Sequence, residues 1–175
     1  MNMKNLIAVF VIALLVLFNT DASAQNGKSK NAEKNNALYT ATYDADFRMG
    51  NADYSTMILE LWKDWDNNTF ALHDYFADTI RMYFPNGSIV SGKKSAMDGA
   101  MAYRKTLKAV KSTVHAYVSL YSKEKNETGV SIWGMEENTM ADGKVEKRDL
   151  HEVWFFNKDG KISTVRQWEA HFKIQ

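Results

Sequence analysis

The sequence predicts an α+β fold in which a curved antiparallel β-sheet wraps around N-terminal helices. Three observations lead to this prediction. Between residues 54 and 65 apolar residues recur every three or four positions, which is the period of an amphipathic helix. From Ser112 onward apolar and polar residues alternate, which is the period of a strand. Asp142-Gly143 and Asp159-Gly160 stand where tight hairpin turns need a positive φ angle.

Three helices are expected before the long run of strands. The first begins with Asp53 as its N-cap, and its apolar stripe consists of Tyr54, Met57, Ile58, Leu61, Trp62 and Trp65. After the polar residues 66–68, Thr69 is expected to cap a short second helix that ends at Phe76. The third helix is expected over residues 93–108, with an apolar face made of Met97, Met101 and Leu107.

Five strands are expected. The first covers residues 78–84, where Ile80, Met82 and Phe84 alternate with polar or larger side chains until Pro85-Asn86-Gly87 ends it. The other four form a meander that is joined by polar turns. Their ranges are 112–121, 129–139, 144–156 and 161–172.

Composition narrows the classes of function. The chain has 175 residues, 22 Lys and Arg against 21 Asp and Glu, a formal net charge of +1 and no cysteine. The missing cysteine excludes a disulfide scaffold, a cysteine-ligated zinc site and a thiol nucleophile. The balanced charge offers no basic face for nucleic acid. The aromatic content of 13% indicates that most of the chain folds around a core.

The N-terminus has the pattern of a signal peptide. Lys4 precedes the apolar run Leu6–Phe18, and Ala22-Ser23-Ala24 places small residues before the expected cleavage site. The run is well short of the roughly 20 residues that a membrane-spanning helix needs, which disfavours an uncleaved anchor. We therefore expect a signal peptide at 1–24, a flexible leader at 25–50 and one domain at 51–175. The protein is expected to be exported, periplasmic or secreted, with no membrane anchor after cleavage near Ala24.

Several short segments together carry a resemblance to a known superfamily. In chain order they are Leu61–Asp66, Tyr75–Asp78, Phe84–Ser88, Ser91–Lys93, Leu150–Trp154 and Asp159–Ile162. Their order and spacing over about residues 50–172 resemble the SnoaL-like branch of the nuclear transport factor 2-like (NTF2-like) superfamily. The resemblance implies a cone-shaped α+β barrel with an apolar internal pocket, often dimeric through the sheet. Members include isomerases, polyketide cyclases, dehydratases, epoxide hydrolases and many proteins without catalysis, so the fold does not settle the function.

The last hairpin holds the candidate catalytic residues. If Phe156 lies opposite Lys161, Asp149 and His151 share a face with Arg166 and Trp168. His151 or Asp149 would then exchange protons in the pocket while Arg166 stabilises negative charge. The structural alternative is an Asp-Arg cross-strand pair beside a hydrogen-bonded histidine. The opposite face is expected to be partly exposed or to contact a subunit, and it carries Arg148, Glu152, Trp154, Phe156, Lys161, Gln167 and Glu169.

The other ligand-binding candidates come from earlier segments. Trp62 and Tyr83 are expected as pocket wall or core. His115 and Tyr117 enter the pocket only if their strand turns that face inward, which the alternation leaves open. No metal is expected, because His115, His151 and His171 lie on different strands without ligand spacing. No cofactor is expected either, because Gly-rich phosphate loops and a nucleophile elbow are absent from the sequence.

Most catalytic residues of the enzymes in this superfamily have no counterpart in this sequence. The general-base aspartate of the ketosteroid isomerases would fall at Phe84, and their tyrosine would fall near Glu60 or Leu61. The acid of the polyketide cyclases would fall at about Ala170, next to Glu169. Asp149 with Arg166 is loosely similar to the Asp-Arg pairing of the limonene epoxide hydrolases.

Three hypotheses of function follow. In the first, the exported domain binds a small apolar or amphipathic molecule in its cone, without ketosteroid isomerase chemistry. In the second, it is a lyase, isomerase or hydrolase that uses His151 or Asp149 as the acid-base group. In the third, it is a dimeric interaction module whose exposed sheet face lies around Trp154 and Phe156.

Overall fold

The computed structural model describes residues 41–43 and 46–171. The predicted signal peptide at 1–24 and the leader residues up to 40 lie outside the described residues. Within the described part, no helix is both long enough and apolar enough to cross a membrane.

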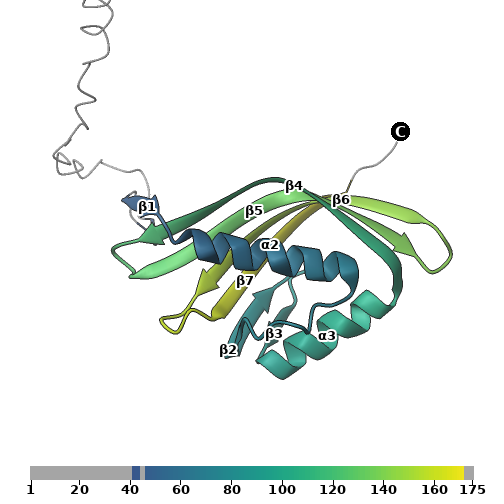
Figure 1. The fold of residues 1–175 in the computed structure, drawn as a ribbon, viewed down its shortest axis with the longest axis horizontal. Coiled ribbons are helices and arrows are strands. Elements are labelled where there is room, and N and C mark those ends of the chain that lie inside the picture. Colours follow the sequence, from purple (N-terminus) through teal and green to yellow (C-terminus); the bar gives the residue numbers. More distant parts are fainter. Residues whose placement is uncertain (1–40, 44–45, 172–175) are drawn as a thin grey trace, which may run out of the picture. The chain divides into compact units, whose positions relative to one another are not determined.

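The described chain forms two helices and one seven-stranded sheet (Figure 1). The elements are β1 (Phe47–Met49), α2 (Ala52–Asn67), β2 (Phe76–Tyr83), β3 (Ile89–Ser91), α3 (Lys93–Lys105), β4 (Leu107–Ser122), β5 (Glu127–Met140), β6 (Val145–Phe156) and β7 (Ile162–His171). The strand order across the sheet is β1-β4-β5-β6-β7-β2-β3.

The predicted α+β class is confirmed. Figure 1 shows the sheet arching over α2 and α3, which both lie on its concave side. The sheet is not closed, and one pairing differs from the prediction, because β2 runs parallel to β7 while all the other neighbours are antiparallel. The chain between β2 and β7 includes α3 and the whole β4–β6 meander, which gives it the length that a parallel connection needs.

The sheet begins earlier in the chain than expected. β1 pairs with the end of β4, with Phe47 opposite Ser122 and Met49 opposite Leu120. The backbone N–H of Gly50 then donates to the carbonyl of Ser119 at 2.8 Å. Residues 47–49, which were expected in the flexible leader, therefore belong to the sheet.

Helix α2 has the predicted stripe but different ends. Its N-cap is Asn51, whose side chain accepts from the N–H of Asp53, so Asp53 lies inside the first turn. Its C-cap is Asn68, in the left-handed conformation with φ 59°. The predicted second helix is wrong, because Thr69 binds back to the carbonyl and the carboxylate of Asp64 instead of starting a new helix.

The buried residues of helix α3 differ from the predicted apolar face. Met101 is partly exposed and Leu107 belongs to β4, whereas Arg104 is buried. The Arg104 guanidinium donates to the carbonyls of Trp65, Asp66 and Leu107 at 2.8–3.1 Å. Carbonyls at a helix C-terminus lack partners in their own helix, so Arg104 satisfies the end of α2 and joins the two helices.

The core lies between α2 and the concave face of the sheet. Its fully buried side chains include Ile58, Leu61, Phe76, Ile80, Val130, Ile132 and Ile162. Trp154 and Phe156 also belong to this core, so the exposed face predicted around them is wrong. The tight turns are confirmed, because Gly143 and Gly160 have φ angles of 88° and 73°.

The register of the last hairpin differs from the prediction by two residues over most of its length. His151 lies opposite Trp168 and Val153 opposite Arg166, with a bulge between Phe155 and Phe156. Because side chains alternate with a period of two, this shift keeps Asp149, His151, Arg166 and Trp168 on one face. The grouping of these residues on one face is confirmed, but their pairing is wrong.

Candidate functional site

A cavity of about 510 Å³ lies between the two helices and the concave face of the sheet. Most of its wall is apolar and aromatic, from Leu61, Trp62, Trp65, Phe70, Met82, Tyr83, Phe84, Tyr103, Leu150, Trp154 and Val165. The α3 side is lined by small residues, namely Ser95, Ala96, Gly99 and Ala100. The cavity stays open because these side chains are too short to fill the space that α3 encloses.

Glu152 of β6 borders the cavity and is buried, with only 6% of its surface exposed. Its Oε2 accepts from the indole N–H groups of Trp62 at 2.8 Å and Trp154 at 3.1 Å. Its Oε1 accepts from the side-chain amide of Gln167 at 2.7 Å. Burial raises the pKa of Glu152, and the nearby Glu136 carboxylate raises it further, while the three donors act in the opposite direction.

A second polar cluster is centred on Arg148, also on β6. Its guanidinium donates twice to Oε1 of Glu136, at 3.0 and 2.6 Å, and once to Glu169 at 2.9 Å. Asn138 donates to the same Glu136 oxygen at 2.6 Å. Burial opposes the charge on Arg148, but Glu136 and Glu169 with Tyr103 together outweigh it and keep the pKa of Arg148 raised. Arg148, Glu136 and Glu169 all border the cavity.

The bulk of Trp62 is accommodated by a glycine on β5. A Cβ atom at Gly134 would overlap the carbonyl oxygen of Thr113 and would lie 3.1 Å from the Trp62 ring. The indole therefore packs directly on the sheet backbone, from where its N–H reaches Glu152. This contact fixes the orientation of the Glu152 carboxyl group.

Some of the predicted site residues border the cavity, and the others do not. Trp62 and Tyr83 border the cavity. The other ligand-binding candidates and both catalytic candidates do not border it: His151, Asp149, Arg166, Trp168, His115 and Tyr117. Along β6 the even-numbered residues Arg148, Leu150 and Glu152 point into the cavity, so the odd-numbered Asp149 and His151 must point out of it. His115 and Tyr117 are exposed on β4.

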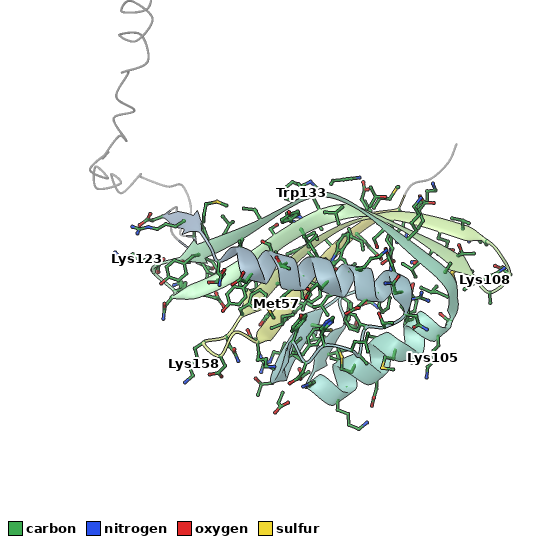
Figure 2. All side chains as sticks on the ribbon, viewed as in Figure 1. Met57, Lys105, Lys108, Lys123, Trp133 and Lys158 are labelled. Carbon is green, nitrogen blue, oxygen red and sulfur yellow. The ribbon has the colours of Figure 1, made fainter. Side chains whose placement is uncertain are left out.

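The outer face carries an exposed aromatic row across three strands, made of Trp133, His151 and Trp168. The ring centroids of Trp133 and His151 are 5.9 Å apart, and those of His151 and Trp168 are 5.7 Å apart. Ser131 Oγ lies 2.9 Å from His151 Nε2, and Arg166 stacks over the Tyr83 ring at 4.4 Å. Figure 2 shows Trp133 on the convex side of the arch, away from α2.

The residues that sequence reasoning missed are the charged ones that face inward: Glu136, Arg148, Glu152 and Glu169. Arg148, Glu152 and Glu169 were expected on a partly exposed or subunit-contacting face, because that face mixes charged with aromatic side chains. Glu136 was given no role. The sequence did contain a feature that could have indicated their burial. Arg148 and Glu152 lie on the same face of β6 as the apolar residues Leu150 and Trp154. Among residues 41–43 and 46–171, no three His, Cys, Asp or Glu side chains are grouped to hold a metal ion.

No protein-family model matches the sequence, and no curated protein matches it. Solved structures do. One is an NTF2-like protein of unknown function from Exiguobacterium sp. 255-15, with a TM-score of 0.54 and 18% identity over 65% of this chain and 97% of that one. A SnoaL-like protein of unknown function from Burkholderia thailandensis matches at a TM-score of 0.51 and 15% identity, over 70% and 98% of the two chains.

A third similar structure is SalBIII, an epoxide hydrolase/cyclase-like enzyme in pyran ring formation of the polyether salinomycin. Its TM-score is 0.54, with 13% identity over 68% of this chain and 92% of that one. At these identities the likeness shows the fold alone.

Proposed function

Because the chain has the fold of the NTF2-like and SnoaL-like proteins, we propose that it binds one small, largely apolar molecule in the cavity between α2, α3 and the sheet. The observation that supports this most strongly is the cavity itself, about 510 Å³ in volume with largely apolar walls that include several aromatic rings. Small-molecule sites typically measure about 300–1,000 Å³ and combine apolar walls with a few polar groups. Export, as the N-terminal sequence indicates, is part of the proposal and places this binding outside the cytoplasm.

The polar groups lie where they can orient a ligand. Glu152, Gln167 and the Arg148 cluster come from the neighbouring strands β5, β6 and β7, whereas α2 and α3 supply mainly apolar and small side chains. A bound molecule would therefore place its apolar part against the helices and its polar group toward the sheet. Hydrogen bonds at one end fix the orientation, while apolar contact supplies most of the affinity.

The enzymatic hypothesis based on His151 and Asp149 loses its support, since neither residue borders the cavity. We propose no catalytic role for them. Within the cavity, Glu152 is the carboxyl group whose raised pKa suits proton exchange with a bound molecule. Binding is the broader proposal and does not depend on turnover.

Filling the cavity from α3 should weaken binding. Gly99 borders the cavity, and a Cβ atom built at this position meets no other atom within 4 Å. Gly99→Phe should lower the affinity for 2-naphthylmethanol, an uncharged probe, by about tenfold or more, because the ring occupies the ligand's space. The measurement is a titration followed by tryptophan fluorescence, since Trp62, Trp65 and Trp154 line the cavity.

Gly99→Ala is the matched control for that substitution. It also raises helix propensity relative to glycine, by up to about 1 kcal/mol, but adds only a methyl group to the cavity. Its affinity should equal that of the parent protein. If neither the probe nor a panel of apolar molecules binds the parent protein, or if Gly99→Phe binds as tightly as Gly99→Ala, the proposal is wrong.

The exposed aromatic row favours a second role, as the contact of a homodimer. Trp133 is 42% exposed and Trp168 50% exposed, and exposed apolar groups of this size commonly mark interaction surfaces. A dimer axis through the outer face would place the same row on both subunits. Sedimentation velocity should show a dimer that becomes a monomer when Trp133 and Trp168 are both replaced by serine, with the thermal midpoint retained. A monomeric parent protein would exclude this role.

A further inference from the structure

We propose that the molecule bound in the cavity carries a positively charged nitrogen, as a protonated amine or a quaternary ammonium group, at the end that faces Glu152 and the Arg148 cluster. This inference rests on the proposed function, and it adds the chemical class of the ligand. It follows from the charges that border the cavity, from the bonds that already engage them, and from the aromatic groups beside them.

The charges that border the cavity are mainly negative. Its ionisable acidic and basic lining groups are three glutamates, Glu136, Glu152 and Glu169, and one arginine, Arg148, with no lysine, histidine or aspartate among the lining residues. One positive charge cannot balance three negative ones. Even with Glu152 in its neutral form, two carboxylates face a single guanidinium, so the cavity retains a net negative charge.

The one cation of the lining is already engaged. Arg148 donates through Nε and Nη2 to Glu136 and through Nη1 to Glu169. An anionic ligand would have to displace one of these carboxylates, leaving it partly buried without a counter-charge, at a cost of several kcal/mol in this environment. Anionic ligands are therefore disfavoured, although an arginine borders the cavity.

Within residues 41–43 and 46–171, Glu152 has hydrogen-bond partners but no counter-ion. Its partners are two indole N–H groups and one amide, all of them uncharged. A buried carboxylate normally needs an opposite charge in contact. An ammonium group on the ligand would supply that charge from the cavity side, and Glu152 would lose its proton to solvent as the cation binds.

Aromatic groups add a second attraction for a cation. The Trp65 and Tyr103 rings stack 6.2 Å apart, and both border the cavity together with Trp62 and Trp154. A cation over the face of such a ring gains about 0.5–2 kcal/mol, and more when water is excluded. Acidic groups next to indole and phenol rings are the usual means by which proteins hold organic ammonium ions.

The test compares three ligands that share one apolar group: 2-naphthylmethylamine, 2-naphthylmethanol and 2-naphthoate. Calorimetric titration near neutral pH should give the tightest binding for the amine, weaker binding by about tenfold for the alcohol, and the weakest for the carboxylate. If the alcohol or the carboxylate binds as tightly as the amine, this inference is wrong and the proposed function stands. If none of the three ligands binds, both this inference and the proposed function are wrong.

Two substitutions test whether the preference for the amine comes from the acidic groups of the cavity. Glu152→Gln keeps an oxygen for Trp62 and Trp154, and an amide flip of Gln167 restores the third bond, so the fold should be retained. It should weaken amine binding by about tenfold and should change alcohol binding much less. Glu169→Gln, at a more exposed position, should also weaken amine binding. It replaces the first variant in the test if Glu152→Gln does not fold.

Glu137→Gln is the control. It removes the same charge from the neighbouring residue of β5, whose side chain pairs with Lys147 outside the cavity. Its amine affinity should match that of the parent protein. Equal losses in the Glu137 and Glu152 variants would mean that only the overall charge of the protein matters, and would overturn the assignment to this site.

Discussion

Arg148→Met should lower the free energy of unfolding by about 3–5 kcal/mol. The substitution roughly keeps the volume of the side chain but removes the guanidinium that joins Glu136 to Glu169. The Glu136 side chain is only 4% exposed, so its carboxylate would remain buried without a counter-charge. Urea unfolding followed by tryptophan fluorescence measures the loss.

Lys147→Met is the matched control for this prediction. Lys147 is the preceding residue of β6, and its ion pair with Glu137 is solvent-exposed, so its loss should cost less than about 1 kcal/mol. Adding Glu136→Gln to Arg148→Met should recover part of the stability, because it removes the unpaired charge. A loss below about 1 kcal/mol for Arg148→Met, or no recovery in the double variant, would contradict the assigned role of the cluster.

Stability should fall as the pH rises through the raised pKa of Glu152. The pKa of this carboxyl group is higher in the folded protein than in the unfolded chain, mainly because it is buried. Below the ordinary glutamate pKa both states hold the proton, so the contribution of Glu152 is fully present. Between the two pKa values only the folded state keeps it, and stability falls by up to about 1.4 kcal/mol per pH unit.

Denaturant titrations from about pH 5 to about pH 8 check this dependence in the parent protein and in Glu152→Gln. The glutamine does not titrate, so the variant should lack this component of the slope and should be the more stable protein at the upper end. Glu137→Gln should follow the parent protein, because its charge lies outside the cavity. Parallel curves for the parent protein and Glu152→Gln would show that Glu152 titrates alike in the folded and unfolded states.

Local patterns were sufficient for most of the fold. The stripe of α2 is readable because a helix that packs on one side must repeat its apolar residues every 3.6 positions. The two Asp-Gly turns are readable because their glycines need positive φ angles, which the structure has. The resemblance to the SnoaL-like proteins is confirmed at the level of the fold. The second helix was predicted wrongly, because Thr69 binds to Asp64, and a residue pattern does not reveal which partner a capping side chain takes.

The site depended on tertiary structure. Alternation alone established that Asp149 and His151 share one face of β6 and that Arg148 and Glu152 share the other. It did not establish which face turns inward, since both faces combine charged with aromatic side chains. The inward face was decided by partners from β5, β7 and α2, which neutralise or hydrogen-bond Arg148 and Glu152 and so make their burial tolerable. These partners are 12 to 90 residues away in the chain, and only the folded sheet brings them together.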